Sequence, residues 1–205
     1  MSHSTIVLLE NGGHAGVPSV YRTLLEIYVE LRNLSHCKTY GYCMDTAYFK
    51  YRLTFFKNVK KGNPYFVGMA DGLDLEVEIP KCKEKIKELE DRGYRQLSVW
   101  NRFDHAGMAD EYNSVYHILS GDAHANKSVL INRHFEHKDG DFNVVFFKDT
   151  SIDSMSHYIF LTVETLIESA VILHTELDSG KAEEIRQLHK GYNAILEELS
   201  SLSAS

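Results

Sequence analysis

The chain has 205 residues, of which 43% are hydrophobic and 25% are charged, and its formal net charge is −7. This length suits one ordinary domain, and the apolar fraction suits a packed globular core. The negative charge argues against nucleic-acid binding through bulk electrostatics, so contact with RNA would need a local basic patch. Three cysteines without a Cys-x-x-Cys pair favour reduced thiols over a disulfide framework or a thiolate zinc site.

The sequence indicates a cytoplasmic protein that binds no membrane. No apolar run reaches the roughly 18 residues that span a bilayer. The first residues, MSHSTIVLLENGG, lack the basic segment and the cleavage site of a signal peptide. We expect one helical domain over residues 1–205, with a disordered serine-rich tail from about residue 200.

Helical periodicity begins at Pro18, a residue that the first turn of a helix accepts. A helix is predicted over about 18–36 because apolar residues recur there at helical spacing, namely Val20, Leu24, Ile27, Leu31 and Leu34.

The next three segments alternate between helix and loop. A second helix is predicted over about 43–61, and the glycines and proline of 62–79 indicate a long loop. Residues 80–92 predict a charged, exposed helix. The second helix has an apolar side made of Met44, Ala47, Tyr48, Tyr51, Phe55 and Val59.

The second half of the chain contains the most apolar helix. A helix is predicted over about 105–120, and alternation on both sides of a glycine turn predicts a hairpin near 129–148. The helix at 151–176 is apolar nearly all round, which favours a central position or a homodimer interface. An amphipathic helix at 181–202 follows. Together these elements predict an all-α, multi-helix bundle with a small β-hairpin insertion.

Two segments resemble one prokaryotic family. The first, LLENGGHAGVPSVYRTLLEIYVELRNL at 8–34, joins a short apolar helix and a glycine-rich break to Arg-x-x-x-Glu on an aliphatic helix. The second, YHILSGDAHANKS at 116–128, resembles the family's Tyr-x-x-Leu-Ser-x-x-x-His segment. This family is catalogued as domain of unknown function 5677, and the resemblance covers about residues 5–175. It implies an all-helical domain without a stated substrate, and it places the family's histidine at His124.

Arg22 and Glu26 form the first candidate site. They lie four residues apart, so their side chains can pair on one face of a helix. One interpretation is a solvated ion pair that contributes little stability. The other is that this face points into a groove, where Arg22 binds an anion.

The second candidate is a polar strip on the helix at 105–120. Asn113, His117, Ser120 and His124 follow one line beside an apolar face that includes Tyr116. Histidines supply acid and base near neutral pH, so this strip could be catalytic. Alternatively, its members are structural residues at the margin of the core.

Metal and serine-hydrolase chemistry are both disfavoured. His117 and His124 are seven residues apart, or about 10 Å along a helix, which is too far for one ion. No Glu-x-x-His motif and no Gly-x-Ser-x-Gly elbow is present. We therefore expect neither a metal nor another cofactor.

A third candidate is a basic segment with interleaved aromatic residues, which could track a phosphate backbone and stack bases. A solvated face beside an aromatic core is the alternative. The basic residues are Lys50, Arg52, Lys57, Lys60 and Lys61.

Two functional hypotheses remain open. Small helical bundles of toxin–antitoxin and defence systems often belong to the metal-independent ribonucleases called HEPN, in which four to six residues separate an arginine from a histidine. That spacing is absent here, since no arginine stands at those positions before His124, and Arg32 and His36 are one residue too close. The first hypothesis is a homodimeric ribonuclease in which His124 is the acid or base and Arg22 stabilises the phosphate. The second is a non-catalytic helical interaction or scaffold module.

Overall fold

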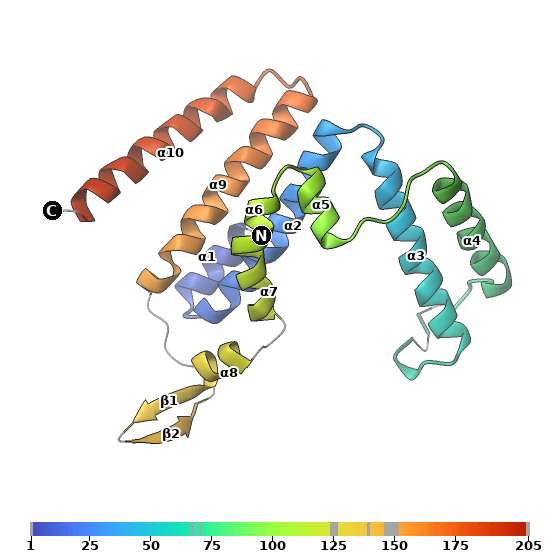
Figure 1. Cartoon of the computed structure of the whole chain (residues 1–205), viewed down its shortest axis with the longest axis horizontal. Coiled ribbons are helices and arrows are strands. Elements are labelled where there is room, and N and C mark those ends of the chain that lie inside the picture. The colour runs from blue at the N-terminus through green and yellow to red at the C-terminus, as the bar shows by residue number, and fades with distance from the viewer. Residues whose placement is uncertain are drawn as a thin grey trace.

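The computed structural model describes residues 2–66, 68–69, 71–123, 127–138, 140–145 and 152–203. The predicted all-α class with a small hairpin is confirmed. Figure 1 shows a long central α2, with α9 and α10 on one side and an α3–α4 hairpin that stands out on the other. The first half of the chain forms α1 (Ser2–Glu10), η1 (His14–Gly16), α2 (Val17–His36), α3 (Tyr40–Lys60), η2 (Pro64–Phe66) and α4 (Leu75–Asp91).

The second half begins with short helical pieces and ends with two long helices. Its elements are α5 (Val99–His105), α6 (Ala109–Glu111), the π-helical turn η3 (Tyr112–Tyr116), α7 (His117–Ala123), α8 (Lys127–His134), β1 (Phe135–Lys138), β2 (Asp141–Val144), α9 (Ile152–Glu176) and α10 (Ala182–Ser203).

The core-facing side of α2 differs from the predicted one. Of the predicted apolar stripe only Leu24 is buried, whereas Ile27 is 53% exposed and Leu34 is 39% exposed. The stripe was misassigned because the tyrosines of α2 are core residues, which a count of aliphatic residues overlooks. The buried side of α2 consists of Val17, Tyr21, Leu24, Leu25, Tyr28 and Val29.

The α3–α4 hairpin corrects two predictions about residues 62–92. The chain does not remain a loop to residue 79, because the side chain of Asp74 accepts a hydrogen bond from the Glu76 amide and starts α4 there. Nor is α4 merely an exposed helix. Its residues Cys82 and Leu89 are buried, and on the facing α3 Phe56 is 2% exposed.

The predicted helix over 105–120 is in fact divided. The hydroxyl of Ser98 caps a separate helix, α5, that the sequence analysis missed. Gly107 then has a φ of 68°, which ends α5 before the chain resumes as α6, η3 and α7. The predicted hairpin is shorter than expected, since residues 129–134 belong to α8 and the strands pair around Gly140.

The predicted central helix at 151–176 corresponds to α9. It lies against α1, α2 and α10, and most of its described side chains are half-buried. Its segment Met155–Glu176 has a mean hydropathy of 1.3, so by length and composition alone it could cross a bilayer. One such helix is weak evidence for a membrane span, because the core helix of a globular protein can have the same length and apolar composition.

The main core joins α2 to α5, η3 and α7. Phe103 of α5 is 1% exposed, and its ring lies 4.8 Å from that of Tyr116 and 5.4 Å from that of Tyr112. Leu119 of α7 is fully buried in the same cluster. Aromatic packing therefore holds the short helices onto α2.

Truncation of a side chain in this aromatic cluster should destabilise the domain. We expect Phe103→Ala to lower the free energy of unfolding by about 3–5 kcal/mol, because it leaves a cavity among the aromatic rings. Trp100→Ala on the same helix removes a side chain that is 38% exposed and should cost far less. Denaturant titration measures both values, and equal losses would contradict this packing.

Candidate polar site

Four polar residues of α2 recur every three or four positions and share one side of the helix. They are Arg22, Glu26, Glu30 and Asn33, and we call them the polar seam. Side chains or backbone from η3, α5 and α3 bond to the seam. The polar side of α2 is therefore covered by protein, although the seam residues other than Asn33 stay partly exposed.

The predicted Arg22–Glu26 pair is joined by a third residue. Nη2 of Arg22 lies 3.2 Å from Oε1 of Glu26 and donates to the Tyr116 hydroxyl at 3.0 Å. The Tyr116 hydroxyl in turn donates to Oε1 of Glu26 at 2.9 Å. The bond with Tyr116 raises the pKa of Arg22, and burial raises the pKa of Tyr116. These bonds hold η3 against α2, and Nε of Arg22 is left buried without a hydrogen-bond partner.

The other residues of the predicted polar strip do not join this contact. Asn113 and His117 are exposed, and Ser120 is half-buried. His124 lies outside the described residues, so its proximity to Arg22 stays a prediction. The structure brings Tyr116 to Arg22 and Glu26, and it leaves His117 on the solvent side of α7.

Three of the five predicted nucleic-acid-binding cations face carboxylates of α4. Lys50 lies 2.7 Å from Glu90, and Arg52 lies 2.8 Å from Glu78. Lys60 pairs with Glu76. Lys57 and Lys61 are exposed, and no ion pair to either is seen within the described part of the chain. The α4 carboxylates thus offset most of the positive charge that the sequence shows on α3.

A second cluster, which the sequence analysis missed, is centred on Glu30. Oε2 of Glu30 accepts a hydrogen bond from the Tyr40 hydroxyl at 2.7 Å, and Oε1 accepts one from Nη1 of Arg102. Burial and the adjacent Glu30 raise the pKa of Tyr40 well above its ordinary value. One carboxylate therefore connects α2, α3 and α5.

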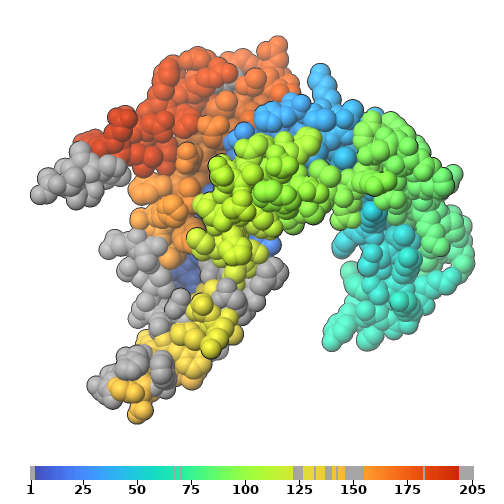
Figure 2. Space-filling view, in the orientation of Figure 1, coloured from blue at the N-terminus to red at the C-terminus, as the bar shows by residue number. Residues whose placement is uncertain are grey.

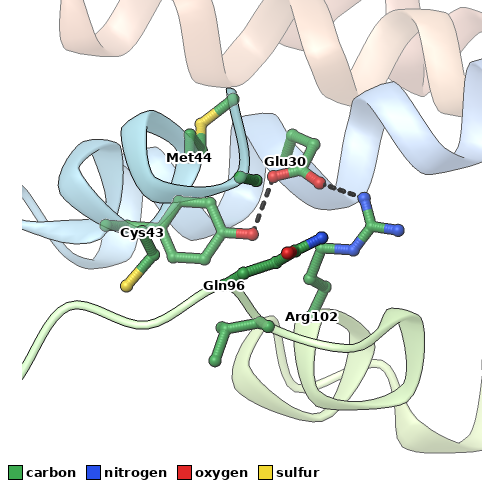
Figure 3. A pocket seen from close by; sticks show the side chains of 8 residues that line it. Glu30, Cys43, Met44, Gln96 and Arg102 are labelled. Atoms are coloured by element: carbon green, nitrogen blue, oxygen red, sulfur yellow. Dashed lines mark hydrogen bonds and ion pairs between the residues drawn. The ribbon is translucent and has the colours of Figure 1, made fainter. Parts of the chain in front are cut away.

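A cavity of about 220 Å³ opens beside this carboxylate. Figure 3 shows Glu30 and Arg102 at its polar end, with Cys43 and Met44 of α3 along its wall and Gln96 nearby. Burial raises the pKa of the Cys43 thiol, which argues against a reactive thiolate. The remaining lining residues are Tyr40, Ala47 and Leu97.

Asn33, at the end of the seam, orients a histidine. Asn33 is fully buried, and its Nδ2 donates to the backbone carbonyl of Arg102 at 2.9 Å. Because that carbonyl only accepts, Oδ1 of Asn33 faces Nδ1 of His105, at 2.8 Å. Nδ1 must therefore carry a hydrogen. In the neutral ring Nε2 is then an acceptor, on a side chain that is exposed.

The sequence did contain signals for these residues. Glu30 and Asn33 continue the line of Arg22 and Glu26 by a further four and three residues. Arg102 and His105 are three apart, so they share one side of the helix that follows the cap residue Ser98. Within the described residues, no three or more His, Cys, Asp or Glu side chains are grouped to hold a metal ion.

The model of a family of unknown function, DUF5677, matches residues 1–142. The chain belongs to this family. The predicted family is thus confirmed, and the matched span contains the whole polar seam and its partners. The match ends at residue 142, so it does not extend to the end of the resemblance expected at about 175. No curated protein and no solved structure matches the chain.

Removal of the bridging hydroxyl should weaken the hold of η3 on α2. We expect Tyr116→Phe to lower the free energy of unfolding by about 1 kcal/mol, since two hydrogen bonds are lost while Arg22 and Glu26 stay paired. Tyr112→Phe, on the neighbouring stacked ring, is the control and should have little effect. If the two substitutions cost the same, the hydroxyl bridge is not stabilising.

Tyr40 should make stability fall at high pH. Its folded pKa lies above the model-compound value of 10.0, so the folded state keeps a proton that the unfolded state releases. The stabilisation is complete below about pH 10 and is lost as the pH rises toward the folded pKa. Denaturant titrations between pH 7 and about pH 11 should show a shallower loss for Tyr40→Phe than for the natural protein. Equal slopes would contradict this linkage.

Proposed function

We propose that the protein is a metal-independent ribonuclease in which His105 is the acid–base residue. The observation that carries this proposal is the Asn33–His105 hydrogen bond, which fixes one ring nitrogen and leaves the other as an acceptor on an exposed side chain. A buried amide that orients an imidazole is a common support for acid–base chemistry. His124 has no described geometry and remains the competing candidate.

The chemistry proposed is an internal transesterification of RNA. Nε2 of His105 takes the proton of a ribose 2′-hydroxyl, whose oxygen then attacks the adjacent phosphorus. The bond from phosphorus to the 5′-oxygen breaks, and that oxygen receives a proton from solvent or from the protonated imidazole. The products are a 2′,3′-cyclic phosphate and a 5′-hydroxyl, so no water is consumed in this step.

Arg102 is the residue that we propose binds the RNA phosphate. It lies one helical turn before His105, and one side of its guanidinium is held by Glu30. Nε of Arg102 is buried without a hydrogen-bond partner. The Glu30 carboxylate fixes the guanidinium but also offsets its charge, so Arg102 would orient the phosphate more than it neutralises it.

A chain of negative net charge needs a local basic patch to bind RNA, and the segment before α5 contributes Arg95 together with Arg92, whose guanidinium lies 3.9 Å from Glu88. No acidic residue occurs between Arg92 and Phe103. The guanidinium of Arg92 lies 4.8 Å from the ring of Tyr42 and 5.2 Å from that of Tyr94, and Trp100 is 38% exposed. Basic and aromatic side chains together suit the backbone and bases of a single strand.

The alternative is a non-catalytic helical interaction module. It is favoured by the Arg22–Tyr116–Glu26 triangle, whose members bond to one another, and by the ion pairs that offset the α3 cations. Under this alternative the polar seam is purely structural. A role in toxin–antitoxin or defence systems is compatible with either proposal.

An assay for cleavage of a defined single-stranded RNA in EDTA distinguishes the ribonuclease from the interaction module. The natural protein should release 2′,3′-cyclic phosphate ends, and His105→Ala should lower the rate by about 10²–10⁴-fold. His117→Ala, on the exposed side of α7, is the matched control and should retain full activity.

Three results would contradict the assignment. Absence of cleavage by the natural protein would support the interaction module. Loss in His124→Ala with full activity in His105→Ala would move the acid–base role to His124. Inhibition by EDTA would exclude the metal-independent mechanism. Thermal melts of each variant show whether a loss of activity reflects unfolding.

A further inference from the structure

One side of α3 is apolar, uncharged and uncovered. Met44 is 37% exposed, Tyr48 is 54% exposed and Tyr51 is 73% exposed. With the half-buried Phe55 they are spaced by four, three and four residues, so they form one stripe along the helix. The sequence predicts this side of α3 to be its apolar face, and the structure leaves it open.

The stripe points away from the rest of the hairpin. At 3.6 residues per turn, its centre lies about 140° around α3 from that of Phe49, Leu53 and Phe56, of which Phe56 is buried. α4 lies on the far side of α3 from the main bundle (Figure 1). Figure 2 shows a hollow on the side of α3 opposite to α4, between the α3–α4 hairpin and the part of the molecule that contains α7 and α8. A partner can therefore reach the stripe.

Two charged residues of α3 border the stripe. Arg52 is ion-paired with Glu78 at 2.8 Å, and Asp45 is an exposed carboxylate that lies next to Met44 and one turn before Tyr48. The other residues that border the stripe around the helix are all uncharged, namely Gly41, Ala47, Thr54, Asn58 and Val59.

We propose that this α3 face binds the same face of a second copy of the chain, with the two-fold axis passing between Tyr48 and Tyr51. Two copies that each carry a net charge of −7 repel one another, so contact between them is least opposed where the touching side chains carry no charge. An isologous interface must also be complementary to itself, which an uncharged aromatic stripe satisfies. Exposed tyrosines are typical central residues of such interfaces.

The interface adjoins the Glu30 cavity. Met44 belongs both to the stripe and to the cavity lining. A second copy bound on α3 therefore covers one wall of the cavity beside Glu30 and Arg102. This dimer does not depend on the proposed ribonuclease activity, because only the α3 surface carries it.

The α3 face also replaces α9 as the expected dimer contact. The apolar sequence of 151–176 predicted a homodimer contact there, but α9 is flanked by α1, α2 and α10 within one chain. On the described part of α9, Leu173 is the exposed large apolar side chain, at 46%. The exposed apolar side chains of α3 are more numerous and form one stripe.

Sedimentation of charge variants at micromolar concentration tests this interface. The natural protein should be a dimer, and Tyr51→Lys and Tyr51→Glu should each raise the dimer dissociation constant by at least about tenfold. An equimolar mixture of these two variants should restore the dimer, because residue 51 lies close to its own copy across the two-fold axis. Val77→Lys, on an exposed apolar residue of α4, is the control and should leave the dimer intact.

Each other outcome overturns the proposal. A natural protein that is monomeric, or a dimer that Tyr51→Lys leaves unchanged, excludes the α3 face. A dimer lost in Leu173→Lys and retained in Tyr51→Lys places the contact on α9. Failure of the mixed variants to associate excludes the two-fold arrangement. Circular dichroism of each variant verifies that the helices are retained.

Discussion

The Glu30 carboxylate, bonded to both Tyr40 and Arg102, is the interaction on which the arrangement of the helices depends. A carboxylate held among packed helices is costly unless hydrogen bonds replace its hydration. Here those bonds come from the first residue of α3 and from the middle of α5, so one group fixes both helices on α2. Arg22, Glu26 and Asn33, the other residues of the polar seam, likewise form hydrogen bonds to groups of η3 or α5. As a result α2 packs apolar residues against α9 and against the aromatic cluster of α5 and η3, and its polar side bonds to η3, α5 and α3.

The two ends of the polar seam differ in what they leave available. At the Arg22 end, three side chains bond to one another around a tyrosine that is 4% exposed, which is an arrangement suited to holding two helices together. At the Asn33 end, the buried amide uses both of its polar atoms to position Arg102 and His105, and His105 is exposed. The same stabilising principle therefore yields a closed contact at one end and an oriented, accessible imidazole at the other.

Sequence reasoning succeeded where local patterns determine structure. The helices predicted at 151–176 and 181–202 end within one residue of the bounds of α9 and α10. The family was also recognised from short motifs. It failed at α5 and α4, because their starts depend on the caps Ser98 and Asp74 and not on apolar periodicity. The Glu30 cluster was missed because its members come from three separate helices, and only the fold brings them together.

The tautomer of His105 shows whether the polar seam orients this side chain. Long-range ¹H–¹⁵N correlation spectra of the imidazole ring, recorded at a pH where the ring is neutral, report which nitrogen carries the hydrogen. The geometry predicts a hydrogen on Nδ1 and a bare Nε2 in the natural protein, because Oδ1 of Asn33 can only accept. In Asn33→Ala the ring should lose this preference. A hydrogen found on Nε2 in the natural protein, or a tautomer that Asn33→Ala leaves unchanged, would contradict the account.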